Sequence, residues 1–89
     1  MVVPEDVQQQ LLSRLKRIEG QARGVQRMVE EHRECGEIIR QLASMRAATH
    51  SASLFLLKHY ARECSHNQAE SAAGEQPLED LIQLLLSSS

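Results

Sequence analysis

The sequence predicts an all-α fold, with two long helices and one short helix in each subunit. Ala, Leu, Glu, Gln and Arg dominate the 89 residues, and there are only four glycines and two prolines. This composition favours helix over strand. Along two long stretches, apolar residues recur every three or four positions, which is the period of an amphipathic helix. The length suffices for one domain, so we take residues 1–89 as a single unit.

The first helix is predicted at about residues 5–32. Pro4 suits a first turn, and the two acidic residues that follow it are favourable at the positive end of a helix. Gly20 and Gly24 lie inside the pattern, where each costs about 1 kcal/mol relative to Ala. Close approach of another helix is the expected reason for them. The apolar stripe consists of Val7, Leu11, Leu15, Ile18, Ala22, Val25 and Val29.

The second helix is predicted at about residues 36–64, beginning near Cys35. Residues 65–76 are polar and contain a glycine, so we expect a linker there. Pro77 then starts a short third helix over about residues 77–86, which has a leucine-rich apolar face. The apolar face of the second helix consists of Ile38, Leu42, Met45, Thr49, Ala52, Leu56 and Tyr60, widened by Ile39, Leu54, Phe55 and Leu57.

These apolar stripes need a partner chain. Helices of about 28 residues are about 40 Å long, whereas the chain has one Phe, one Tyr and no Trp with which to fill a core. A chain of this size buries only about 60–65 % of its unfolded surface by itself. We therefore expect a symmetric homodimer that forms an antiparallel four-helix bundle.

Hydropathy argues against a membrane protein, and the charge distribution favours a protein that binds a polyanion. No apolar run approaches the roughly 20 residues that span a bilayer, and no signal peptide is found, so we expect a cytoplasmic protein without a membrane partner. Residues 14–62 carry ten basic against five acidic residues, a net charge of +5, whereas residues 63–89 carry five acids and no base. A basic middle between acidic ends predicts a polyanion-binding surface. An enzyme is not expected, because the sequence offers no catalytic triad, phosphate loop or paired-carboxylate pocket.

Cys35 and Cys64 are 29 residues apart, at the two ends of the second helix. That separation is about 43 Å along a helix, whereas a disulfide or a shared metal needs Cα atoms within about 7 Å. If the helix pairs antiparallel with its copy about Thr49–His50, Cys35 of one chain approaches Cys64 of the other. The alternative is two inert, buried thiols, but the symmetric placement of the cysteines about the helix centre favours a paired site.

The stretch LLSRLKRIEGQARGVQRMVEEHREC, followed by IIRQLASMRAA, closely resembles the copper-sensitive operon repressor (CsoR) family. The resemblance covers roughly residues 8–64. It implies a disc-shaped homotetramer, a dimer of the antiparallel dimers, without a helix-turn-helix motif. It also implies repression by binding double-stranded operator DNA, relieved when an inducer occupies the cysteine site between subunits.

The residue at position 60 separates the branches of this family. Copper sensors of the family hold Cys, His and Cys at the positions of Cys35, Tyr60 and Cys64, and here a tyrosine takes the place of the histidine. A phenol is a poor ligand for soft Cu(I), which favours thiolate and tolerates imidazole. A cysteine pair without that histidine is similar to the persulfide-sensing branch, the CsoR-like sulfurtransferase repressors (CstR). We therefore expect a redox-active cysteine pair that senses sulfane-sulfur donors without a cofactor.

A Cu(I) sensor is the alternative, with Cys35, Cys64 and one histidine as ligands. His59 is rotated by about 100° from position 60 around the helix, whereas His32 and His66 lie near the two cysteines in the sequence. A helical structural or adaptor protein is an alternative of another class. It explains the apolar stripes but neither the basic cluster nor the placement of the cysteines.

The DNA-binding face is expected on the first helix, with one arginine from the second. Arg14, Arg17 and Gln21 follow one another at helical spacing, and the family resemblance implies DNA contacts in the same stretch. Lys and Arg there are expected to contact mainly phosphates, with DNA shape adding specificity. A solvated basic face is the alternative. The expected residues are Arg14, Lys16, Arg17, Gln21, Arg23 and Arg46.

Overall fold

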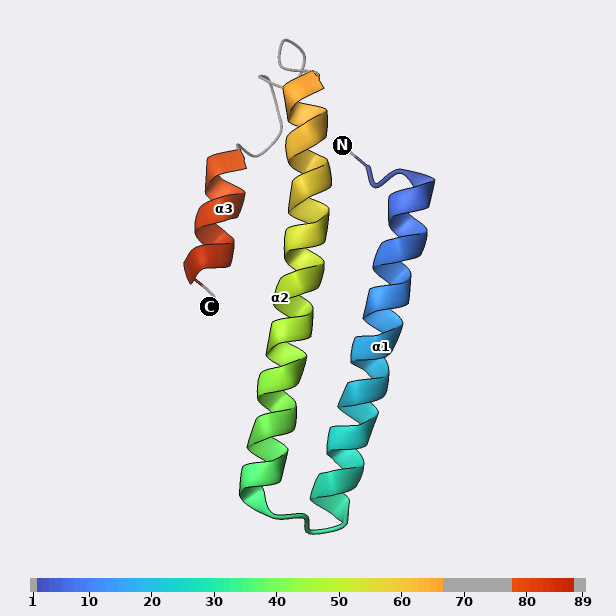
Figure 1. The fold of residues 1–89 in the computed structure, drawn as a ribbon, viewed down its shortest axis with the longest axis vertical. Coiled ribbons are helices and arrows are strands. Elements are labelled where there is room, and N and C mark those ends of the chain that lie inside the picture. The colour runs from blue at the N-terminus through green and yellow to red at the C-terminus, as the bar shows by residue number, and fades with distance from the viewer. Residues whose placement is uncertain (1, 67–77, 88–89) are drawn as a thin grey trace.

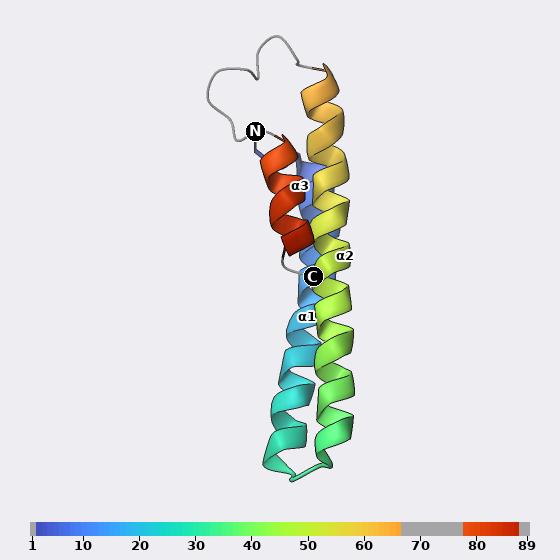
Figure 2. The ribbon, with the colours of Figure 1, turned by 90° about the vertical axis from the view of Figure 1, so that its left-hand side faces the viewer.

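The computed structural model describes residues 2–66 and 78–87, with side chains described for residues 2–62 and 78–87. These residues contain three helices: α1 (Glu5–Glu30), α2 (Cys35–His66) and α3 (Leu78–Ser87). The described ranges contain no strand, which confirms the all-α fold with two long helices and one short one. The helices α1 and α2 run antiparallel as a hairpin, and α3 lies against the C-terminal half of α2 (Figures 1 and 2).

The helix α1 ends two residues before the expected boundary because of a Schellman motif. The backbone N–H of His32 donates to the carbonyl of Val29 at 3.1 Å, and that of Arg33 donates to the carbonyl of Met28 at 3.0 Å. His32 has a φ of 58°, the left-handed conformation that such a motif requires and that glycine usually supplies. The chain therefore turns sharply after Glu31, and α2 begins at Cys35.

The turn between the long helices is tied to the start of α2. The carbonyl of Glu34 accepts the backbone N–H groups of Glu37 and Ile38 at 3.0 and 3.3 Å. Arg33 donates twice to one carboxylate oxygen of Glu37, from Nε at 3.0 Å and from Nη2 at 2.7 Å. Backbone and side-chain contacts between the residues on either side of Cys35 thus fix its position.

The far end of α2 extends two residues beyond the expected boundary, to His66. Residues 65 and 66 of the expected linker are therefore helical, and the rest of that linker and Pro77 lie outside the described residues. The helix α3 begins at Leu78 and ends at Ser87, whose hydroxyl donates to the carbonyl of Leu84 at 3.0 Å.

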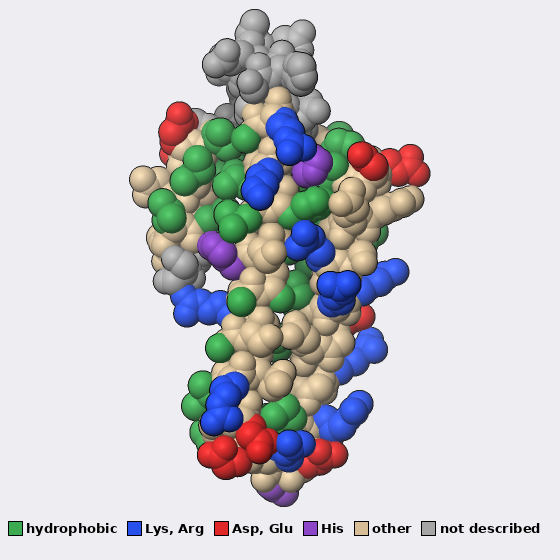
Figure 3. Space-filling model, in the orientation of Figure 1, with side chains coloured by type: hydrophobic (Ala, Val, Ile, Leu, Met, Phe, Trp, Pro, Cys, Tyr) green, Lys and Arg blue, Asp and Glu red, His purple; other side chains and the backbone are tan. Residues whose placement is uncertain are grey.

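A single chain has very little core. Among the described residues, only Val7, Val25 and Ala52 are buried apolar residues. By contrast, Ile39 is 59 % exposed and Leu42 is 49 % exposed, and apolar side chains cover much of the surface over α3 and the adjoining part of α2 (Figure 3). Because folding must offset a large loss of chain entropy by burial, one chain leaves much apolar surface that a partner could cover.

The two glycines of α1 have no close neighbour in their own chain. A Cβ atom built at Gly20 or at Gly24 would meet no atom within 4 Å. The close helix approach expected at these glycines is therefore not made by α2 of the same chain. Their backbone lies on an open side of α1.

Within the described ranges, none of the helices combines the length and the apolar character needed to span a membrane.

Candidate sensor and nucleic-acid sites

The two cysteines lie at opposite ends of α2. Cys35 is its first residue and has an exposed, unbridged thiol. Cys64 lies in its last turn, and the side chains of residues 63–66 lie outside the described residues. The helix is continuous between them (Figure 1), so the two positions are about 43 Å apart at 1.5 Å per residue. One chain does not bring these cysteines together.

No complete metal site is present within the described part of one chain, which contains no group of three or more His, Cys, Asp or Glu placed to hold a metal ion. His32 is exposed and belongs to the turn before α2. His59 is half-buried and packs edge-to-face on Phe55, with ring centroids 5.0 Å apart and an interplanar angle of 67°. The side chain of His66 lies outside the described residues. Soft thiolates suit Cu(I), so the two cysteines could hold this ion only if two chains contribute.

Three of the expected DNA-binding residues share one groove at the seam between α1 and α2. Arg14, Arg17 and Gln21 line it from α1, with Ala48 and Ser51 opposite on α2. These three α1 residues follow one another at intervals of three and four, which places them on one face of the helix.

Polar contacts across this seam orient two of the three side chains. Nη1 of Arg14 donates to Oγ of Ser51 at 3.1 Å, and Nε2 of Gln21 donates to Oγ of Ser44 at 3.2 Å. The Cζ atom of Arg14 also lies 4.7 Å from the centroid of the Phe55 ring. The seam is therefore a polar groove in which contacts with α2 hold the side chains of Arg14 and Gln21 in place.

Two further expected residues lie on another face of α1. Lys16 is rotated by about 200° from Arg14 around the helix axis, and Arg23 lies two turns beyond Lys16 on the same side. Arg23 approaches Glu19 at 3.6 Å, in a pair whose side chains are 72 % and 64 % exposed. Such a solvated ion pair contributes little and leaves the arginine accessible.

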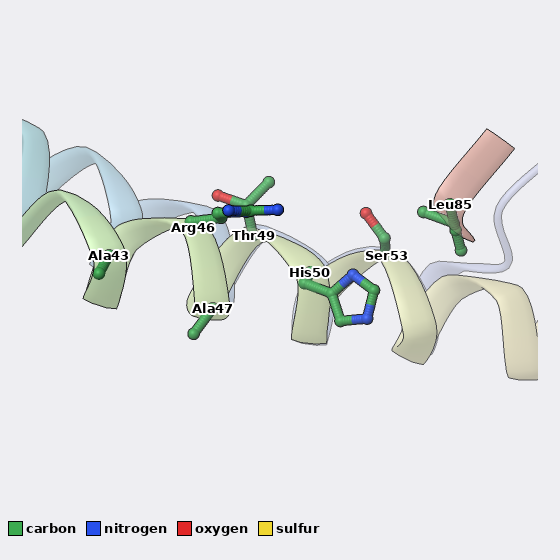
Figure 4. Close-up of a pocket in the computed structure, with 7 residues that line it drawn as sticks. All are labelled: Ala43, Arg46, Ala47, Thr49, His50, Ser53 and Leu85. Carbon is green, nitrogen blue, oxygen red and sulfur yellow. The ribbon is translucent and has the colours of Figure 1, made fainter. Parts of the chain in front are cut away.

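Arg46, the sixth expected residue, lines a different groove. This groove has a volume of about 690 Å³ and lies between α2 and the end of α3 (Figure 4). Arg46 and His50 are one turn apart there, and Leu85 closes the groove from α3. Within one chain, the six residues thus form three separate groups, and Lys and Arg side chains are spread along the molecule in Figure 3.

Sequence reasoning missed the α2 residues that hold the seam. Ser44, Ser51 and Phe55 contact the α1 side chains. From the sequence, the two serines had no predicted role and Phe55 was assigned only to the apolar face. The available signal was their spacing, since intervals of seven and four place them on one face of α2. The partners on α1 were not predictable without the register of the two helices.

The chain is similar in sequence to known transcriptional repressors. Residues 7–87 match the family model described as "Metal-sensitive transcriptional repressor". The chain is 42 % identical over 73 residues to the copper-sensing transcriptional repressor CsoR of Bacillus subtilis (strain 168), covering 82 % of this chain and 72 % of that protein.

Two solved structures have the same fold. One is the copper-sensing repressor CsoR with Cu(I) from Geobacillus thermodenitrificans NG80-2, with a TM-score of 0.78 and 34 % identity over 99 % of this chain and 92 % of that chain. The other is the nickel-responsive transcriptional regulator InrS, with a TM-score of 0.69 and 32 % identity over 99 % of this chain and 94 % of that chain. These two proteins share the helical architecture and differ in the signals that their names give, copper and nickel.

Proposed function

Because the chain belongs to the family of metal-sensitive transcriptional repressors, we propose that it binds operator DNA as an oligomer and is released when its cysteines react with sulfane sulfur. The family consists of transcriptional repressors, which are not enzymes. The choice of sulfane sulfur as the inducer rests on the residues at three positions. Cys35 and Cys64 lie at the two ends of α2. Tyr60 occupies the position where the family resemblance implies a histidine in copper sensors.

The reacting pair is formed by two chains. The midpoint between the cysteines lies at Thr49–His50, so an antiparallel pairing of two α2 helices about this point aligns Cys35 with Cys64 of the second chain at both ends. The exposed apolar residues Ile39 and Leu42 on α2 supply surface for such a pairing. The symmetric dimer therefore contains two equivalent sites, and two dimers form the proposed tetramer.

The chemistry requires only thiols and a sulfane-sulfur donor. The thiolate of Cys35 attacks the sulfane sulfur of a persulfide, forms a Cys35 persulfide and releases the donor as a thiol. The thiolate of Cys64 from the second chain then attacks the sulfur bonded to Cβ of Cys35, which forms a disulfide and expels hydrosulfide. If Cys64 is itself persulfidated, the same displacement leaves a trisulfide. Cys35 attacks first in this scheme because its thiol is exposed at the positive end of α2.

Cu(I) is the second candidate signal. The relatives from Bacillus subtilis and Geobacillus thermodenitrificans are copper-sensing by name, and two thiolates suit this ion. A third ligand would have to replace the histidine that position 60 lacks. His59 is already packed against Phe55, so binding through it requires α2 to rearrange near its C-terminal end.

The functional test compares inducers on the protein bound to labelled operator DNA. We expect glutathione persulfide or inorganic polysulfide to release the DNA, whereas one equivalent of Cu(I) per chain leaves it bound, as measured by fluorescence anisotropy. The matched variant Tyr60→His supplies the missing imidazole and should gain release by Cu(I). Stoichiometric release of the unaltered protein by Cu(I), with no response to persulfide donors, would contradict the proposal and favour the metal sensor.

Assembly gives a second prediction. Because so much apolar surface is exposed in one chain, we expect a dimer or tetramer at micromolar concentration in sedimentation velocity experiments. Leu42→Asp places a charge on this apolar surface and should shift the protein toward smaller species, whereas the neighbouring Gln41→Asp should not. A stable, folded monomer of the unaltered chain would remove the basis for a site between subunits.

A further inference from the structure

The side chain of Arg14 is held by two residues of the opposite helix. Its Nη1 atom donates to Oγ of Ser51 at 3.1 Å, and its Cζ atom lies 4.7 Å from the centroid of the Phe55 ring. Ser51 and Phe55 are four residues apart and are therefore neighbours on one face of α2. Both contacts cross from α1 to α2, so the orientation of this arginine depends on α2.

This arrangement leaves the guanidinium group of Arg14 able to bind an anion. The group is planar and has five N–H donors, and a cation–π contact with a ring does not exclude hydrogen bonds from its other donors. Ser51 accepts a hydrogen bond from one of these donors. The half-buried Arg14 side chain lines the same groove as Arg17. A side chain that is oriented before binding loses less conformational entropy when it meets a phosphate.

The same Phe55 ring also contacts the C-terminal part of α2. His59 packs edge-to-face on Phe55, with centroids 5.0 Å apart. It lies five residues before Cys64, which is about 7.5 Å along the helix. Three side chains in contact, Arg14, Phe55 and His59, therefore lead from the seam groove to the turns of α2 that precede the second cysteine.

We infer that Phe55 is a positioning residue that holds Arg14 in its DNA-binding orientation and, through His59, couples this orientation to the sensor end of α2. The inference rests on the proposed function, in which Arg14 contacts operator DNA and Cys64 reacts with the inducer. A reaction that displaces the last turns of α2 moves His59, and with it the ring on which the guanidinium group stacks. Operator affinity then falls because the arginine loses its orientation.

A double-mutant cycle tests the positioning role. Phe55→Leu keeps an apolar side chain but removes the ring, and should weaken operator binding about three- to tenfold for each contacting subunit. In the Arg14→Ala background the same change should have no further effect, because the ring then has no arginine to orient. In the matched Arg17→Ala background the two losses should add, since Phe55 stacks on Arg14 and not on Arg17 in the described structure. Phe55→Tyr keeps the ring and should keep most of the affinity.

The coupling to the sensor end has its own readout, the ratio of operator affinities before and after polysulfide treatment. Phe55→Leu and His59→Leu should both reduce this ratio, while a non-reducing gel of the same samples reports that the cysteines have reacted. A purely structural role would weaken binding equally in both states and leave the ratio unchanged. Circular dichroism and sedimentation check folding and assembly, and Phe55→Met replaces Phe55→Leu in the cycle if the leucine variant does not assemble.

Each outcome separates this inference from the proposed function. If the losses from Phe55→Leu and Arg14→Ala add, the positioning role is overturned, although the DNA-binding role of Arg14 stands. If the ratio is unchanged in both Phe55→Leu and His59→Leu, the coupling is overturned. If Arg14→Ala binds operator as the unaltered protein does, both the inference and the proposed DNA contact of Arg14 are overturned, whereas the cysteine chemistry is unaffected.

Discussion

The double substitution Arg14→Ala with Arg17→Ala is expected to reduce operator affinity by about a hundredfold or more while the oligomer stays intact. Both side chains line the groove at the seam between α1 and α2, and every subunit that contacts DNA loses two phosphate contacts. Each single variant should also flatten the plot of log K against log salt by about 0.9 per contacting subunit. Anisotropy titrations at several salt concentrations measure both quantities.

Two comparisons sharpen this prediction. Lys16→Ala with Arg23→Ala removes the same charge from the opposite face of α1, so it shows whether DNA contacts the seam, the outer face or both. Lys58 lies seven residues after Ser51 on the same face of α2, so Lys58→Ala shows whether the DNA contact extends along the seam beyond the two arginines. Unchanged affinity and salt slope in both arginine variants would place the DNA-binding surface elsewhere on the molecule.

The second large effect is expected at Cys64. The variant Cys64→Ala should still bind operator, because the proposed DNA contacts lie on α1 and at Arg46, but polysulfide should no longer release it. The reaction should stop at a persulfide on Cys35, since the second thiol of the site is absent. Intact-mass analysis under denaturing conditions should find sulfur added to the monomer and no covalent dimer.

Cys35→Ala is the matched variant, and it should also lose both release and the covalent dimer. The two variants differ in what remains, because only Cys64→Ala retains the exposed thiol at the start of α2. Full release of the DNA by polysulfide in either variant would mean that a single cysteine suffices and that no bridge between subunits is needed.

Much of the fold was predictable because it depends on local properties of the chain. Apolar periodicity predicted the three helices, and the length of the second helix predicted that its cysteines are far apart. The end of α1 was not predictable in the same way. His32 takes the left-handed conformation that glycine usually adopts, so the sequence lacks the residue that normally marks a Schellman motif.

The candidate sites were only partly predictable because they depend on how the two long helices align. Helical spacing grouped Arg14, Arg17 and Gln21, and the structure brings them to one groove. Spacing along one helix could not predict that Phe55, assigned to the apolar face, would form the surface against which Arg14 lies. Arg46 was expected on the same DNA-binding face, yet within one chain it lines the groove near α3.

The central claim is that Cys35 of one chain and Cys64 of another react as a pair, and a mixture of the two single-cysteine variants tests it most directly. Cys35→Ala and Cys64→Ala chains are refolded together, treated with polysulfide and examined by mass spectrometry under non-reducing, denaturing conditions. We predict a covalent dimer of one chain of each kind, joined between Cys35 and Cys64 by two or more sulfur atoms and lost on reduction. Neither variant alone should form it. A mixture that yields no covalent dimer, or an equal yield from either variant alone, would contradict the account.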